Sequence, residues 1–448
     1  MEFGINVDSL QNVVALSNTQ EKMKSIQLKT EKYKSKIVEY SFFVQNEIEI
    51  SEKLNKVVVD PESPYNNIAY RFLTIQKHDF VKICEANKLI LEKMNINLDS
   101  YNNDGNKSNT KKIVLLKYKI NKMFPFIDRF FYHNHINNTS LFPDKPRTSL
   151  IFWDFINEYE CLFNDLLFFA DNQVLFLDLS SKNLLYNRKF TIFFDKFDKC
   201  LLRKDFGVSK KDISEDGNLQ KLSKYIEIET YIDKFIMLIE SIEYYGNKHF
   251  DLYLSKQLIK NKNFYSVYQD LDNIIDDYLD NLYYLKNFSD KFKYDNKTNW
   301  KSQIKTRIEE NIQFLNIIPE KLNWKLYLLM LLENYQYTVW ETFSLNSLFL
   351  NVTYYMIKMF NVQEKSSVIH RYFKFLFKNM DMNCTSFNNS NSNNNINIMA
   401  CRDDYNKYRD SFEDKKDYDC LENLLCLSHV TIEQQQELYD LLLNNKYI

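Results

Sequence analysis

The stretch that decides the fold is Val174–Asp198, which reads VLFLDLSSKNLLYNRKFTIFFDKFD. Two apolar runs flank a polar turn that contains Asp178 and Asn183, and Asp195 directly follows the second run. Asp and Asn are common turn residues, so a plain β-hairpin is one interpretation. The other is a site that holds a metal ion and a nucleotide, because Mg²⁺ prefers carboxylate and amide oxygens.

The composition is that of a soluble globular protein with long helices. The 448 residues suffice for two or three lobes, and 45% hydrophobic with 26% charged residues is ordinary for this class. Only 5 Gly and 6 Pro are present, which argues against a fold built on glycine-rich loops. The 58 basic and 60 acidic residues nearly cancel, so no nucleic-acid partner is expected.

Signals for export or membrane insertion are missing from the sequence. The start, MEFGINVDSLQN, lacks the basic and apolar regions of a signal peptide, and no run of 18 apolar residues occurs. The seven cysteines are scattered and form no CxxC pair. We therefore expect a soluble protein in a reducing compartment, without a transmembrane segment.

Hydrophobic periodicity predicts a mixed N-terminal part and a helical remainder. Before residue 160, helices are expected at 19–40, 79–94 and 111–123, and strands at 40–44, 57–59, 69–76 and 147–155. After it, helices are expected at about 219–292, 303–333 and 339–360, with an Asn-rich loop at 383–398. The fold class that follows is α+β, with two lobes of different character.

The polar residues of the opening stretch are spaced as in a known catalytic segment. Asp178 and Asn183 form D-x-x-x-x-N, and Asp195 ends the hairpin that follows them. This pattern, including the length of the hairpin, resembles the catalytic segment of eukaryotic-type protein kinases. The resemblance implies that Asp178 accepts the proton of the attacking hydroxyl, whereas Asn183 and Asp195 hold Mg²⁺ at ATP. Asp198 is the alternative to Asp195, because DKFD permits either alignment.

Three further matches follow in the order that the family has. IPE (Ile318–Glu320) resembles A-P-E, and VWETFSLNSLFL resembles a helix with Glu341 at its acidic position. DDYNKYRDSFED places Arg409 where an arginine would pair with Glu320. The chain is similar to the divergent Ser/Thr kinase-like proteins of large DNA viruses, over about residues 120–200 and 315–415. The compartment implied is the cytoplasm of a host cell or a virion.

The resemblance implies a protein-kinase-like two-lobe fold. Residues 1–60 would be an N-terminal extension, 61–155 a small β-containing N-lobe and 156–448 a large helical C-lobe. A helical insertion at about 200–315 would separate Asp195 from the IPE match, and its role is open.

The lysine that contacts ATP is harder to place. Lys77 ends YRFLTIQK, and Glu92 follows it on an expected helix at a spacing that suits a lysine–glutamate ion pair. Lys82 is the second choice. An equally good interpretation is that these are solvated surface charges.

The sequence departs from the family at several positions. Phe176 and Leu177 replace the usual His-Arg, and Ser180 stands where a phosphate-contacting lysine is usual. Lys196 and Phe197 replace the Phe-Gly of D-F-G, and the literal DFG at 205–207 lies too far along the chain. Three hypotheses stay open: an active Ser/Thr kinase with a protein substrate, an inactive pseudokinase or scaffold that binds a protein partner, and an unrelated helical structural protein.

Overall fold

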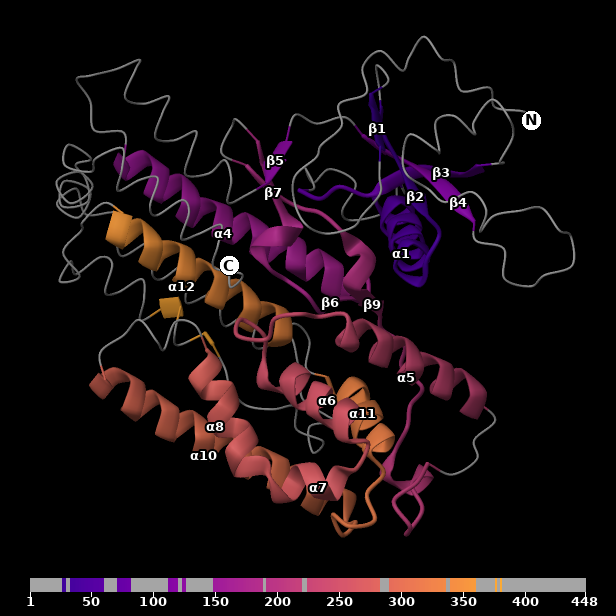
Figure 1. Cartoon of the computed structure of the whole chain (residues 1–448), viewed down its shortest axis with the longest axis vertical. Helices are drawn as coiled ribbons and strands as arrows, with labels where there is room; N and C mark the ends of the chain where they lie inside the picture. Colours follow the sequence, from indigo (N-terminus) through magenta and orange to yellow (C-terminus); the bar gives the residue numbers. More distant parts are fainter. Residues whose placement is uncertain are drawn as a thin grey trace, which may run out of the picture. The chain divides into compact units, whose positions relative to one another are not determined.

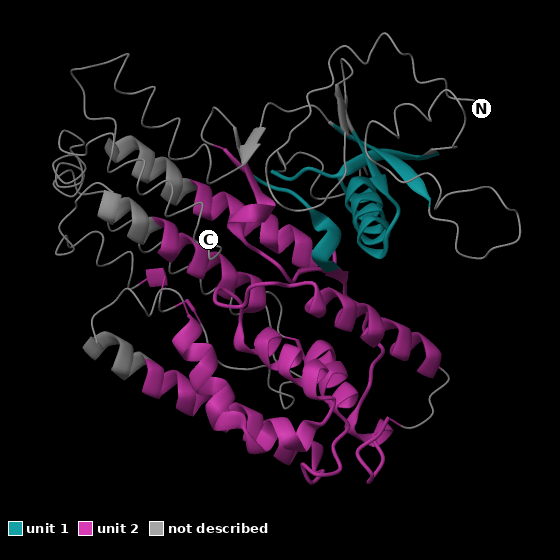
Figure 2. Cartoon of the chain, in the orientation of Figure 1, with its two compact units in different colours: residues 1–123, 193–200 teal, residues 124–192, 201–448 magenta. Residues whose placement is uncertain are grey.

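The computed structural model divides the chain into two compact units (Figure 2). Unit 1 comprises residues 1–123 and 193–200, and unit 2 comprises residues 124–192 and 201–448. The structure describes residues 26–29, 33–59, 71–81, 112–119, 123–125, 148–187, 191–219, 224–282, 290–335, 339–359, 375–376 and 379–380. Helices and strands both occur, which confirms the α+β class.

Unit 1 contains a four-stranded antiparallel sheet in the order β1-β2-β4-β3 (Figure 1). Its strands are β1 (Ile26–Lys29), β2 (Tyr33–Glu39), β3 (Ile75–Val81) and β4 (Ile113–Lys119). On β2, Ile37 pairs with Ile26 on one side and with Leu115 on the other. Residues 1–60 were expected to form an N-terminal extension. In the structure they supply two strands, β1 and β2, to the same sheet as β3 and β4.

Helix α1 (Phe42–Val59) begins three residues after β2 and packs on this sheet. Its buried Val44 and Ile48 belong to one apolar cluster with the sheet residues Val38, Ile75, Val114 and Leu116. Two polar side chains of the same helix serve the backbone of β3: the Ile75 amide donates to Ser51 Oγ at 3.1 Å, and Asn55 Nδ2 donates to the Ile75 carbonyl at 2.8 Å. The helix is therefore joined to the sheet by apolar packing and by hydrogen bonds to the main chain.

Several local expectations for the N-terminal part of the chain are wrong. The expected helix at 19–40 contains β1 and β2, the expected strands at 40–44 and 57–59 lie largely in α1, and the expected helix at 111–123 contains β4. The helix expected at 79–94 begins within β3, where residues 79–81 form a strand, and residues 82–94 lie outside the described residues. The cause is tertiary: β2 and β4 are held by pairing on both sides, which overrides the helix propensity of their lysine-rich sequences.

In unit 2, helix α4 (Thr148–Asp171) replaces the strand that was expected at 147–155. A 24-residue helix satisfies its own backbone, and the apolar run Leu150–Trp153 lies in the same helix as the buried residues that follow it. Short strands come next along the chain: β6 (Val174–Phe176) and β7 (Leu184–Asn187) lie in unit 2, whereas β8 (Ile192–Phe194) and β9 (Cys200–Leu202) lie at the two ends of the segment 193–200, which belongs to unit 1. β6 pairs with β9, and a second sheet has the order β5 (Met123–Pro125), β7, β8.

The rest of unit 2 is helical, as the sequence predicts. The helices are α5 (Tyr225–Glu240), α6 (Phe250–Asn261), α7 (Phe264–Gln269), α8 (Leu271–Asn281), α10 (Asp290–Leu315), α11 (Trp324–Glu333) and α12 (Val339–Met359). Residues 339–352 of α12 are all buried, and both α4 and α12 contact β6. In the part of the chain that the structure describes, no helix has the length and apolar character needed to cross a bilayer.

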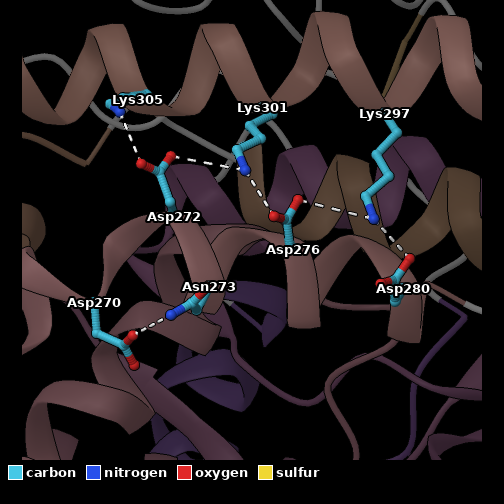
Figure 3. A network of polar contacts seen from close by, with 8 residues as sticks. All are labelled: Asp270, Asp272, Asn273, Asp276, Asp280, Lys297, Lys301 and Lys305. Carbon is cyan, nitrogen blue, oxygen red and sulfur yellow. Dashed lines mark hydrogen bonds and ion pairs between the residues drawn. The ribbon is translucent and has the colours of Figure 1, made fainter.

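Helices α8 and α10 lie side by side and are joined by a ladder of charges (Figure 3). Three aspartates of α8 face three lysines of α10, both sets at intervals of four residues: Asp272, Asp276 and Asp280 with Lys305, Lys301 and Lys297. The nitrogen–oxygen distances of these pairs are 3.0, 2.7 and 2.8 Å. This ladder lies within the predicted insertion.

Candidate functional site

The turn after β6 brings Asp178 and Asn183 together in unit 2. The chain leaves β6 at Phe176 and passes through the short 3-10 helix Ser181–Asn183 into β7. The Asn183 side-chain amide donates to the Asp178 carbonyl, which closes the turn. Asn183 is buried, whereas the Asp178 side chain is 16% exposed and so remains accessible from solvent. The turn thus presents a carboxylate on a fixed backbone.

Glu341, near the start of α12, fixes the chain just before this turn. The Phe176 amide donates to Glu341 Oε1 at 3.0 Å, and the Tyr335 hydroxyl donates to Oε2. Burial raises the pKa of Glu341, and these two hydrogen bonds oppose that shift. The acidic position that the sequence singled out on this helix is therefore a backbone acceptor for the segment that carries Asp178.

A lysine that the sequence did not single out contacts Asp178. Lys248 Nζ lies 2.9 Å from Asp178 Oδ1 and donates to the Leu179 carbonyl at 2.7 Å. The Lys248 side chain is 0% exposed, so the ammonium is held away from bulk water. It comes from the loop between α5 and α6, far along the chain from the turn and inside the expected insertion. Its only signal in the sequence is a polar Gly246–Asn247 turn between apolar segments.

In unit 1, the residues after β8 fold into a tight turn. Asp195 follows the strand, Lys196 has the left-handed conformation with φ 60°, and the 3-10 helix Phe197–Lys199 begins. Phe197 is buried and meets the Phe72 ring edge-on, with a centroid distance of 6.1 Å. Phe197, two residues after Asp195, is thus a core residue of this turn, and Lys196 between them has a left-handed backbone.

Helix α1 anchors this turn. Asn46 Nδ2 donates to the carbonyls of Asp198 at 2.9 Å and of Cys200 at 2.6 Å, and Asn46 itself is buried. The next residue of the helix, Glu47, is buried and accepts from the Tyr118 hydroxyl at 3.3 Å. One turn of α1 therefore places an amide on the Asp198 segment and a carboxylate beside it.

The pKa of Glu47 is raised by burial and by the charges around it. Burial raises its pKa to about 8, and the negative charges of Asp198 and Asp195 add to the rise. The positive charge of Lys36, on β2, and the hydrogen bond from Tyr118 oppose it. Unit 1 thus gathers a strand lysine, a helix glutamate and two aspartates close enough to act on one another electrostatically.

These carboxylates suit a divalent cation. Burial is the main cause of the raised pKa of Glu47, and the charges of Asp198 and Asp195 add to it; a bound cation would offset these two negative charges. Mg²⁺ is usually held by one or two protein carboxylates together with substrate phosphates. No cluster of three or more His, Cys, Asp and Glu suited to a metal occurs among the described residues. Asp195 and Asp198 therefore fit a Mg²⁺ ion that a nucleotide brings with it.

Two further predicted residues that the structure describes, Lys77 and Glu320, are not brought to either place. Lys77 is exposed on β3, where it pairs with Lys117 of β4. Glu320 is exposed in a turn between α10 and α11. Lys82, Glu92 and Arg409 lie outside the described residues.

The literal DFG at 205–207 forms a local turn in unit 2, as its position in the sequence suggested. The Gly207 amide donates to Asp205 Oδ1 at 2.8 Å, and the Phe206 amide donates to Glu333 Oε1 at 3.0 Å. Asp205 is exposed and takes no part in the groups described above.

The sequence was compared with known proteins. No protein-family model matches the chain, and no curated protein matches it.

Proposed function

We propose that this chain is a Mg²⁺-dependent phosphotransferase of the Ser/Thr protein-kinase type, which moves the γ-phosphoryl group of ATP to a protein hydroxyl. The observation that carries the proposal is the set in unit 1: Lys36 on a strand, Glu47 on the helix that follows it, and Asp195. Protein kinases use a strand lysine, a helix glutamate and a metal-binding aspartate in these roles. Lys36 and Glu47 are independent of the motif that first suggested the family, and Asp195 belongs to both.

In this proposal, the residues of unit 1 serve the nucleotide. Lys36 contacts the α- and β-phosphates and is oriented by Glu47. Asp195 holds the metal ion, and Asp198 is the alternative ligand. Mg²⁺, when bound, neutralises charge on the β- and γ-phosphates. Lys36 and Glu47 take the roles for which the sequence suggested Lys77 or Lys82 with Glu92.

The residues of unit 2 serve the acceptor. Asp178 orients the attacking hydroxyl and receives its proton, and Asn183 closes the turn and would offer its amide oxygen to a metal ion. Glu341 keeps the backbone of this segment in place through the Phe176 amide. Little covalent chemistry is asked of the protein, so fixed positions of these groups account for most of the rate.

The second candidate is a pseudokinase that binds a protein partner. Lys196 and Phe197 favour it, because an exposed lysine in the left-handed conformation follows Asp195 where the family has D-F-G. Such a chain would retain the fold without positioning ATP for transfer. Transfer activity separates the two candidates.

The test is a thermal titration of the full chain with Mg-ATP, followed by radiolabelled transfer to casein. Binding should raise the melting temperature by a few °C at millimolar Mg-ATP, by linkage. Asp195→Asn should remove the Mg²⁺-dependent part of the rise, whereas Asp178→Asn should keep the rise and abolish transfer. Asp205→Asn, the aspartate of the literal DFG, is the matched control and should change neither.

No rise at millimolar Mg-ATP would overturn the phosphotransferase assignment. A rise without transfer to casein or to the chain itself would select the pseudokinase. Equal losses from Asp205→Asn and Asp195→Asn would show that the site has been placed at the wrong aspartate.

A further inference from the structure

The loop between α5 and α6 is built into the protein interior. Residues 245–250 are all buried, and the backbone of Lys248 is fixed from two sides. Its amide donates to the Tyr245 carbonyl at 3.0 Å, and its carbonyl accepts from the Tyr278 hydroxyl at 2.8 Å. Gly246 permits this packing, because a Cβ there would lie 2.7 Å from the Asn281 carbonyl oxygen. The backbone of the loop is therefore fixed, and its side chains extend from fixed positions.

Two side chains of this loop reach the turn that carries Asp178. Lys248 Nζ contacts both Asp178 Oδ1 and the Leu179 carbonyl, and Asn247 Nδ2 donates to the same carbonyl at 3.4 Å. The insertion thus holds the backbone of the turn and the carboxylate of Asp178 together. A lysine ammonium has three donors and can serve several acceptors in this way.

Stability alone does not account for a lysine at this position. Removing an ammonium from water carries a large desolvation penalty, and a buried ion pair seldom exceeds an apolar side chain of the same size in net stabilisation. The Lys248 stem could be replaced by a methionine of similar length without loss of packing volume. A buried charge beside the one accessible carboxylate of the turn therefore points to a role for the charge.

The turn lacks a lysine at the one position where the family resemblance implies it, and Lys182 of the turn faces Glu243 instead. Ser180 occupies the position, two residues after Asp178, where related kinases have a lysine. Lys248 places an ammonium 2.9 Å from the same aspartate from a different part of the chain. Lys248 thus supplies, next to Asp178, the positive charge that Ser180 does not provide.

We propose, on the basis of the phosphotransferase assignment above, that Lys248 is the positioning residue of Asp178 and that the helical insertion completes the catalytic turn through it. Lys248 fixes the position of Oδ1, so that Asp178 is held ready for the acceptor hydroxyl. The segment between Asp195 and α12 is then part of the working enzyme.

The step that this arrangement serves is balanced in atoms and charge. The acceptor oxygen forms a bond to the γ-phosphorus, and the bond between that phosphorus and the β,γ-bridging oxygen breaks. ADP leaves with the electron pair, and the hydroxyl proton passes to the Asp178 carboxylate. Lys248 stays protonated throughout and neither gains nor loses a bond to phosphorus.

The experiment measures single-turnover transfer from Mg-ATP to casein by the full chain. Lys248→Met should lower the transfer rate by about 100-fold or more and leave the KM for ATP within about threefold, because general-base positioning acts on the chemical step. Adding Ser180→Lys to Lys248→Met returns the ammonium from within the turn and should restore the rate by at least about tenfold. Lys325→Met removes a lysine that bridges Glu229 and Asp233 elsewhere in unit 2, and it should leave the rate unchanged.

A purely structural lysine would give a different pattern. Its loss would lower the amount of folded protein but not the rate per folded molecule, and adding Ser180→Lys would leave that rate unchanged. Lys248→Gln, which keeps a hydrogen-bond donor without the charge, should be as slow as Lys248→Met; a rate near that of the original chain would overturn the proposal.

The outcomes also separate this inference from the assignment on which it rests. If the unaltered chain neither binds Mg-ATP nor transfers phosphate, the assignment fails. If the unaltered chain transfers phosphate and Lys248→Met does so equally fast, the role of Lys248 alone is refuted.

Discussion

Two groups of lysine–carboxylate pairs in unit 2 differ in their surroundings. Lys248 and Asp178 form a single pair whose side chains are 0% and 16% exposed. The ladder between α8 and α10 consists of repeated pairs on a helix surface, and Lys301 and Asp276 at its centre are 31% and 40% exposed (Figure 3). The distances are similar, at 2.9 and 2.7 Å, so geometry alone does not distinguish the two groups.

The difference shows what each group of charges does. Water and salt screen the ladder, so each pair contributes little free energy and the ladder acts by repetition along two helices. The buried pair is unscreened, but the desolvation of two charges offsets most of its attraction. A buried pair is thus sensitive to the loss of one partner while contributing little when intact. Such sensitivity is expected where a charge must be held in one place.

The largest effect should come from breaking the buried pair on one side only. Lys248→Met leaves Asp178 without its ammonium and should lower the free energy of unfolding by about 3–5 kcal/mol. Lys248→Met combined with Asp178→Asn removes both charges and should regain most of that loss, which urea unfolding of the four proteins in a double-mutant cycle would measure. A coupling energy near zero would contradict the description of this pair as buried and unscreened.

Glu47 in unit 1 is a third case, a buried carboxylate whose charged neighbours are mostly negative. Its folded pKa of about 8 lies above the ordinary value of 4.5, so the folded chain keeps a proton that the unfolded chain releases. Stability should therefore fall as pH rises from about 5 to 8, by roughly 2–4 kcal/mol in the absence of Mg²⁺.

Glu47→Gln should abolish this fall, and Glu49→Gln on the same helix should not. Urea unfolding at pH 5, 6.5 and 8 in EDTA would measure it. If Glu47→Gln and the original chain show the same pH dependence, Glu47 does not titrate in this range.

Glu341 is a buried carboxylate whose two hydrogen-bond donors are neutral groups. Glu341→Ala leaves the Phe176 amide and the Tyr335 hydroxyl without this acceptor and should cost about 1–3 kcal/mol. Glu341→Gln keeps one acceptor oxygen and should cost less. Thermal unfolding of both variants would rank them, and an alanine variant as stable as the glutamine variant would show that the Phe176 hydrogen bond carries no weight.

The parts of the candidate site that depend on neighbours in the sequence could be predicted. Asp178 and Asn183 are close together along the chain, and one turn is enough to bring them into contact. Glu341 was singled out because VWETFSLNSLFL resembles a helix with an acidic residue at that position, and its backbone acceptor role depends on a contact far along the chain. The helices between residues 225 and 333 could be predicted from their hydrophobic periodicity.

The parts that depend on distant contacts could not be predicted. Lys36 lies in a lysine-rich segment without strand alternation, and its strand forms because β1 and β4 pair with it. Glu47 lies on a helix whose two ends, YSFFV and VVV, are rich in β-formers. Lys248 reaches Asp178 from a loop far along the chain, and no local pattern records that contact.

The smallest effect should come from the ladder. Lys301 contacts Asp276 at 2.7 Å and Asp272 at 3.7 Å, yet Lys301→Ala should lower the free energy of unfolding by only about 0.2–1 kcal/mol, because these charges are exposed. The loss should shrink further in 0.5 M salt, where surface pairs are screened, whereas the loss from Lys248→Met should hardly change. Urea unfolding at low and high salt measures both. A salt-independent loss above about 2 kcal/mol for Lys301→Ala would mean that the ladder is as desolvated as the buried pair, and the distinction between them would fail.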